Sequence, residues 1–224
     1  MLLRLEGVLT PDQLRGAREM LANAKFVDGK ASAGMAAARV KHNQEADRQA
    51  AEIRNLDNLV MGSLVRHPVY RAGALALKVA TPFYARYVPG MRYGDHVDDP
   101  IMGVGEGLYR TDIAITVFLN EPDSYDGGEL VIQTAFGDQA VKLPAGDGVL
   151  YPASSIHHVN PVTRGERLVA VTWVQSLVRD PARRELLYGL NQARETLLSN
   201  SPDAPETAQV NAAYLNLVRM WADI

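Results

Sequence analysis

A histidine and an aspartate near the middle of the chain offer ligand atoms of the kind that bind a divalent metal ion. His96 and Asp98 are separated by one residue, and residues i and i+2 of a β-strand point to the same face. The imidazole and the carboxylate can therefore converge on one ion. Asp95 and Asp99 would point to the opposite face, which makes Asp98 the better candidate.

A third protein ligand has to come from a different element. His157 and His158 are both candidates, because they follow a second short run that begins at Tyr151. The register of that strand is open, so the spacing alone does not choose between them. Two histidines and one carboxylate are the ligand set of non-haem Fe(II) oxygenases, which leaves three coordination positions for a bidentate 2-oxo acid and O2.

An arginine stands where such a site needs a cation. Arg167 comes at the start of the apolar run Leu168–Val174. A guanidinium stays charged when it is buried, and it can bind the distal carboxylate of a 2-oxo acid through two parallel hydrogen bonds. Each of these signals alone has an ordinary structural explanation. Their order along the chain, on strand-like elements, favours the metal site.

The residues that must position these ligands have the pattern of short β-strands from about Lys78 onward. Residues 113–119 alternate in a way that is typical of a half-buried strand, and Asp126-Gly127-Gly128 marks a turn. Many short strands at even spacing predict an antiparallel sandwich or barrel. The predicted strands are 83–88, 93–98, 113–119, 129–134, 139–143, 148–151 and 168–174.

Helical patterns flank this β region. Thr10-Pro11-Asp12-Gln13 fits a capping box, and apolar residues at helical spacing predict a second helix that ends before Pro68. Apolar stripes follow Asp180-Pro181, which resembles a helix start. We therefore predict an N-terminal helical segment, a β domain and a C-terminal helical segment, at 1–77, 78–178 and 179–224. His42, which sits in a polar stretch with Lys41, Asn43 and Gln44, is interpreted as exposed.

Composition excludes several classes of function. The chain has 224 residues, a formal net charge of -3 and no cysteine, so thiolate metal sites, iron–sulfur clusters and cysteine nucleophiles are excluded. The charge offers no basic excess for nucleic acid. We see no apolar run of membrane-spanning length and no signal peptide, and we expect a cytoplasmic protein with neither membrane nor nucleic acid as a partner.

Several motifs together resemble those of a known enzyme family. The segment RYVPGMRYGDHVD at 86–98 is similar to the region around the first two iron ligands of prolyl 4-hydroxylase-like enzymes. The bacterial PKHD-type hydroxylases are the closest resemblance, and it extends over nearly the whole chain. The motifs that resemble this group are RTD at 110–112, YDGGEL at 125–130, PVTRG at 161–165 and QSLVRD at 175–180.

The resemblance implies a fold, a ligand set and a reaction. The fold would be mainly β with flanking helices, a double-stranded β-helix (a jelly-roll, cupin-like barrel). His157 would be the third iron ligand, Arg167 would bind the cosubstrate, and Tyr93 would line the cosubstrate pocket. Fe(II) and 2-oxoglutarate would be required, with L-ascorbate as a further candidate cofactor. The reaction would be hydroxylation with O2, linked by context to iron uptake, on a small molecule or a side chain.

Some alternatives stay open at this point. Arg110 either contacts the substrate or forms a structural ion pair with Asp112. A non-catalytic sensor of iron or 2-oxoglutarate could use the same barrel, and so could a cupin-like isomerase or hydrolase. A helical interaction module is a further reading of the C-terminal stripes, and a homo-oligomer through the terminal helices is expected from the resemblance.

Overall fold

The computed structural model describes residues 1–224 apart from the side chain of Ala51. Its larger sheet has the strand order β1-β14-β10-β17-β6-β4-β2, with β5 paired beside β17, and all of these pairs are antiparallel. The strands are β1 (Leu3–Leu5), β14 (Gly148–Pro152), β10 (Ile113–Phe118), β17 (Arg167–Ser176), β6 (Phe83–Tyr87), β4 (Gln44–Ala46), β2 (Phe26–Asp28) and β5 (Ala76–Val79).

A smaller antiparallel sheet faces the larger one, in the order β13-β12-β15-β7-β3. Its strands are β13 (Gly137–Val141), β12 (Leu130–Thr134), β15 (His157–Val159), β7 (Arg92–His96) and β3 (Lys41–His42). Two short ladders complete the β structure, β11 (Asp126–Gly127) with β16 (Val162–Arg164) and β8 (Ile101–Met102) with β9 (Tyr109–Arg110). The predicted jelly-roll architecture is confirmed.

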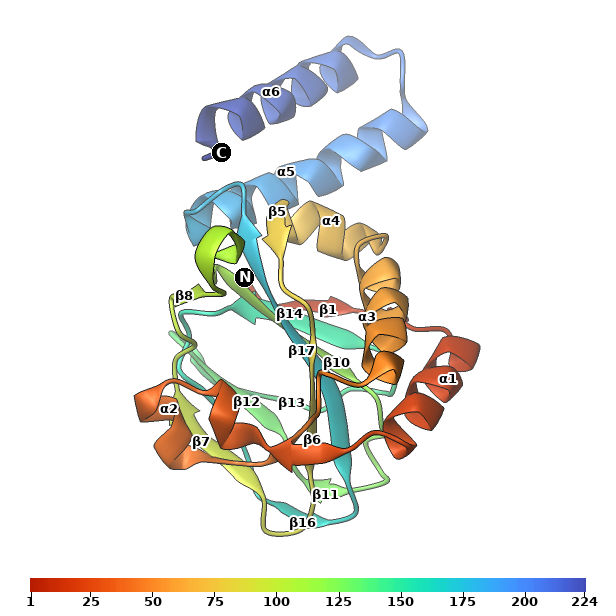
Figure 1. The fold of residues 1–224 in the computed structure, drawn as a ribbon. Helices are drawn as coiled ribbons and strands as arrows, with labels where there is room; N and C mark the ends of the chain where they lie inside the picture. Colours follow the sequence, from red (N-terminus) through yellow and green to blue (C-terminus); the bar gives the residue numbers. More distant parts are fainter.

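Alternation along β17 divides the molecule into an inner and an outer core. Val169 belongs to the cluster between the sheets, whereas Leu168 and Ala170 belong to the cluster on the outer face. Helices α1 (Pro11–Ala22) and α3 (Ala51–Leu64) cover that outer face (Figure 1). The half-buried pattern predicted for 113–119 is therefore wrong, because helices bury the outer face and β10 is buried throughout.

The N-terminal segment is less helical than its sequence pattern indicates. The capping box is confirmed, since Thr10 Oγ accepts from the Gln13 backbone and Gln13 Oε1 accepts from the Thr10 backbone. Besides α1, α3, α2 (Met35–Val40) and α4 (Pro68–Ala74), however, the segment also supplies β1 to β4. Each of these strands has two or three residues, too few for an alternating pattern to be recognised.

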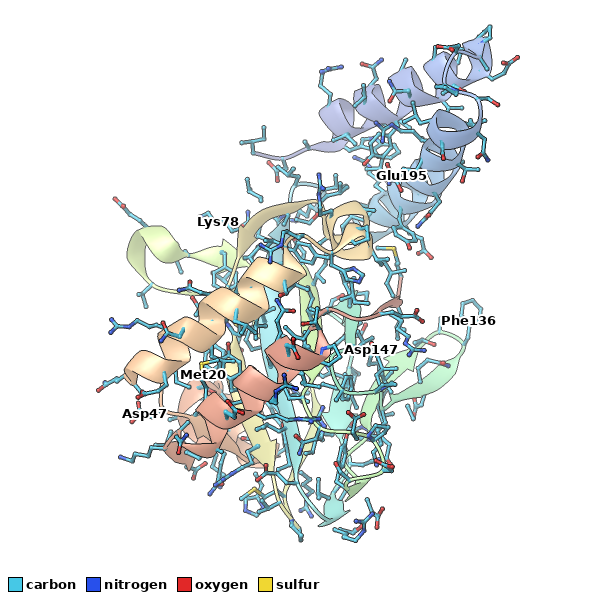
Figure 2. The ribbon with its side chains drawn as sticks, turned by 90° about the vertical axis from the view of Figure 1, so that its right-hand side faces the viewer. Met20, Asp47, Lys78, Phe136, Asp147 and Glu195 are labelled. Atoms are coloured by element: carbon cyan, nitrogen blue, oxygen red, sulfur yellow. The ribbon has the colours of Figure 1, made fainter. Side chains whose placement is uncertain are left out.

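The C-terminal helices lie at one end of the barrel. Helices α5 (Pro181–Asn200) and α6 (Pro205–Trp221) form a pair that projects beyond the sheets, with α5 beside α4 (Figure 1). Asp180 caps α5 by accepting from two backbone amides. At a distance from this pair, Phe136 at the tip of the β12–β13 hairpin points into solvent (Figure 2). Among the described residues, no helix combines the length and apolarity needed to cross a bilayer.

Candidate metal centre

Strands β7 and β15 bring two histidines together inside the barrel. His96 and His157 are register partners across these antiparallel strands, and their ring centroids lie 4.2 Å apart. Asp98 follows two residues after β7 ends, and its Oδ1 lies 3.8 Å from His157 Nε2. One ligand atom from each of the three residues lies within 4.8 Å of the others. The three residues singled out in the sequence therefore meet at one point.

Backbone carbonyls fix the orientation of both rings. Gly94 O lies 2.8 Å from His96 Nδ1, and Ser155 O lies 3.0 Å from His157 Nδ1. Because a carbonyl only accepts, each Nδ1 carries the proton and each Nε2 keeps a lone pair for a metal. Burial, helped by His157, lowers the pKa of His96 to about 4. His96 is therefore neutral at pH 7, the form that binds a metal.

The aspartate of the trio occupies an environment that disfavours a free carboxylate. The Asp98 side chain is 8% exposed, and its Oδ2 has no hydrogen-bond partner in the part of the chain that the structure describes. Burial raises the pKa of Asp98, and the neighbouring His157 acts against that rise. A divalent cation would pair with this carboxylate and stabilise its charge. Two imidazole nitrogens and one carboxylate oxygen also suit Fe(II), so the residues present fit the ion.

The geometry distinguishes His157 from its neighbour. His158 points to the other face of β15, where its Nδ1 lies 2.7 Å from Asp95 Oδ1 and its Nε2 lies 3.1 Å from Asn160 Oδ1. His157 is 4% exposed and faces the cavity. Asp95 also points away from the trio, as the alternation of the strand predicts.

A cavity between the sheets connects the trio to a buried arginine. Arg167 is 2% exposed and lies over the rings of Tyr87 and Phe118, at 5.0 and 5.7 Å from their centroids. Its Nε has no hydrogen-bond partner among the described residues. Other residues of the cavity wall include Tyr93, Met102, Thr116, Leu130, Tyr151, Val159, Val171 and Trp173. No ion pair joins Arg167 to a carboxylate among the described residues, so this end of the cavity is suited to bind an anion.

Two further residues predicted from the sequence have defined positions. Tyr93 lines the cavity and stacks on His96, with ring centroids 3.6 Å apart and planes 13° apart. Arg110 makes a bidentate ion pair with Asp112, with Nε 2.7 Å and Nη2 3.0 Å from the two carboxylate oxygens. Asp112 also accepts from the Ser176 backbone. The geometry at Arg110 is therefore that of the structural ion pair, the second of the two alternatives.

The sequence interpretation missed three polar residues of the cavity wall. Lys41, Asn43 and Glu45 are 7%, 3% and 8% exposed and line the cavity. His42 itself is exposed. The sequence gives no signal of this burial, because every residue from 41 to 45 is polar and no alternation marks one face.

Lys41 and Glu45 form a buried ion pair, and we expect the loss of Lys41 alone to destabilise the fold. Lys41 Nζ lies 2.5 Å from Glu45 Oε1 and 2.8 Å from Ser32 Oγ. Lys41→Met leaves a buried carboxylate without its countercharge, which costs about 3–5 kcal/mol of unfolding free energy. For a chain of this size, thermal unfolding should show a melting temperature roughly 6–20 °C lower.

A double variant separates the loss of the pair from a loss of packing. Lys41→Met/Glu45→Leu removes both charges and should recover most of the stability. Lys30→Met replaces an exposed lysine of the N-terminal segment and should leave the melting temperature nearly unchanged. If Lys41→Met has the same melting temperature as Lys30→Met, an unpaired Glu45 costs no stability and the prediction is wrong.

Comparisons with known proteins agree with this geometry. Residues 82–175 match the 2OG-Fe(II) oxygenase superfamily, and residues 181–223 match the PKHD-type hydroxylase C-terminal domain. A PKHD-type hydroxylase of Thioalkalivibrio sulfidiphilus is 54% identical over 224 residues, and the match covers 100% of both chains. A PKHD-type hydroxylase of Hyphomonas neptunium is 46% identical over 228 positions, again with 100% of both chains covered.

A solved structure supports the fold. A prolyl hydroxylase from Trichoplax adhaerens, in complex with a peptide from a hypoxia inducible factor, superposes with a TM-score of 0.58. The match covers 83% of this chain and 86% of that one at 15% identity. The chain thus belongs to the PKHD-type hydroxylases of the 2OG-Fe(II) oxygenase superfamily, enzymes that depend on Fe(II) and 2-oxoglutarate.

Proposed function

We propose that His96, Asp98 and His157 hold one Fe(II) ion and that the chain hydroxylates a C–H bond of its substrate. The observation that supports this most is that three ligand atoms, one from each residue, lie within 4.8 Å of one another in the wall of the cavity. When bound, the iron would couple oxidative decarboxylation of 2-oxoglutarate, which gives succinate and CO2, to transfer of one oxygen atom of O2 to the substrate.

The contribution of the protein is orientation and electrostatics. The Gly94 and Ser155 carbonyls hold the two imidazoles in the tautomer that leaves Nε2 free. In our proposal Arg167 binds the distal carboxylate of 2-oxoglutarate in a place sheltered from water, where a charge-assisted hydrogen bond is strong. Tyr93 packs against the ring of His96 and borders the same cosubstrate pocket.

The remaining assignments are supported by the resemblance alone. They are a small-molecule or side-chain substrate, a role in iron-uptake metabolism, L-ascorbate as an added reductant and association through the terminal helices. A cytoplasmic location, which is expected from the sequence pattern, is part of the same proposal. In a turnover assay, an ascorbate requirement would appear as a rate that decays without the reductant and recovers when it is added.

Gly128 offers a prediction about the cosubstrate arginine. Its φ is +67°, and a Cβ at this position would lie 3.1 Å from Arg167 Cδ and 3.0 Å from Val162 Cγ2. Gly128→Ala should therefore cost about 1–2 kcal/mol in backbone strain and displace Arg167. We expect a raised KM for 2-oxoglutarate, measured by succinate formation. Gly137→Ala is the control, because φ there is +106° and an added Cβ meets no described atom within 4 Å; an unchanged KM in Gly128→Ala would contradict the prediction.

The experiment that tests the proposed function is an anaerobic titration with Fe(II) and then 2-oxoglutarate, followed by a succinate assay after O2 is admitted. The parent chain should bind both ligands and form succinate. His96→Ala should lose Fe(II) binding, and Arg167→Ala should bind Fe(II) but bind 2-oxoglutarate weakly. If both variants behave like the parent, the assignment of the site is wrong.

A further inference from the structure

The segment 41–46 contributes one strand to each of the two sheets and so joins them. Its first part, β3, pairs with β7 so that Lys41 lies opposite Tyr93. Its second part, β4, pairs with β6 so that Gln44 lies opposite Arg86. Asn43 is the residue between the two strands, where the chain crosses from the smaller sheet to the larger one. The crossing makes Asn43 part of the cavity wall.

The register places Asn43 at the same level as the cosubstrate arginine. Arg167 pairs with Tyr87 across β17 and β6. Continuing the β4–β6 register by one residue from Gln44 sets Asn43 next to Tyr87 on its other side. Burial raises the pKa of Tyr87, and the nearby Asn43 amide acts against that rise, although its contact with the Tyr87 hydroxyl lacks the distance and angles of a hydrogen bond. Asn43, Tyr87 and Arg167 thus form one row across three strands.

The amide of Asn43 is buried without a partner. The residue is 3% exposed, and neither Oδ1 nor Nδ2 makes a hydrogen bond to any described residue. Oδ1 packs against Gly29, where an added Cβ would lie only 2.0 Å from it. Nδ2 lies farther than Oδ1 from that Cβ position, so Gly29 packs against the oxygen branch of the amide. An unpaired buried donor is costly in a folded protein, so this one indicates a ligand that accepts its hydrogen bond.

We propose that Asn43 donates a hydrogen bond from Nδ2 to the distal carboxylate of 2-oxoglutarate, beside Arg167. The inference rests on the proposed function. A carboxylate has about four acceptor positions, and a guanidinium fork fills two of them, so a further donor has a place to bind. Lys41 is the other nearby cation of this segment, but Glu45 and Ser32 already occupy its ammonium group. Asn43 therefore helps to select a 2-oxo acid that carries a second carboxylate.

Two cosubstrates and one substitution test the proposal. Asn43→Leu keeps the approximate shape of the side chain and removes the amide. Under anaerobic conditions with Fe(II) bound, the variant should bind 2-oxoglutarate about 10- to 100-fold more weakly than the parent. The affinity for 2-oxopentanoate, which has the same carbon chain without the distal carboxylate, should not change. An unaltered affinity for 2-oxoglutarate, or equal weakening of both ligands, overturns the proposal.

A second substitution displaces Asn43 without altering it. Gly29→Ala places a Cβ on the Asn43 oxygen and should reproduce the selective loss for 2-oxoglutarate. Gly16→Ala, where an added Cβ meets no described atom within 4 Å, is the matched control. If Asn43→Leu fails to fold, the comparison of Gly29→Ala with Gly16→Ala tests the proposal instead. If the parent does not bind 2-oxoglutarate, the proposed function is overturned as well. If the parent, Asn43→Leu and Gly29→Ala all bind it equally well, only this inference is overturned.

Discussion

Asp98→Asn is expected to lower the rate of succinate formation by at least about a thousandfold and to make the metal-free protein more stable. A bound metal contributes several kcal/mol to the reaction, and each 1.4 kcal/mol corresponds to roughly a factor of ten. Without metal, the same carboxylate destabilises the fold, because its side chain is buried and Oδ2 has no hydrogen-bond partner among the described residues. Removing its charge should relieve about 1–3 kcal/mol of that burial cost.

Two measurements on the same variant check both parts of this expectation. Thermal unfolding in the presence of a chelator should show a melting temperature several degrees above that of the parent, given roughly 2–4 °C for each kcal/mol at this chain length. Asp95→Asn is the matched control, because Asp95 lies on β7, three residues before Asp98, but points outward to His158. If Asp98→Asn forms succinate at the rate of the parent, Asp98 is not a metal ligand.

Arg167→Met is expected to raise the KM for 2-oxoglutarate by about 30-fold to several thousandfold, with Fe(II) affinity unchanged. Truncating one partner of a buried, hydrogen-bonded charge pair costs about 2–5 kcal/mol, and each 1.4 kcal/mol is tenfold in affinity. Methionine fills much of the space between Tyr87 and Phe118, so the loss should be electrostatic rather than a collapse of packing. Succinate formation as a function of 2-oxoglutarate concentration measures it.

The control for this prediction is an arginine on the adjacent strand. Arg86 faces the outside, where it donates to Gln44 and lies over Phe26. Arg86→Met should therefore keep the KM of the parent. A KM for Arg167→Met within a factor of three of the parent, or a parallel rise in both variants, would contradict the role of Arg167.

The sequence predicted most of the β barrel because its strands are long enough to show their alternation. The runs at 83–88, 113–119 and 168–174 correspond to β6, β10 and β17. Strands β1 to β4 have two or three residues and gave no such signal. The burial of β10 on both faces was also missed, because it depends on the helices that pack against it.

The candidate site shows the same division between local and tertiary information. Spacing alone brought His96 and Asp98 to one face, even though β7 ends at His96. Spacing left the choice between His157 and His158 open, and the family resemblance pointed to His157. The β7–β15 register that turns His157 inward contains an irregularity that no spacing rule gives. The inward position of Asn43 also depends on pairing with both sheets, since a polar residue in a polar stretch carries no sign of burial by itself.

The central claim is that one metal ion lies between β7 and β15 and is held from the inner face of both strands. Anaerobic equilibrium dialysis against Fe(II) tests it most directly, with His157→Ala compared with His158→Ala. We predict one tightly bound iron per chain for the parent and for His158→Ala, and almost none for His157→Ala. Retention of a full equivalent of iron by His157→Ala, or its loss from His158→Ala, would contradict the account.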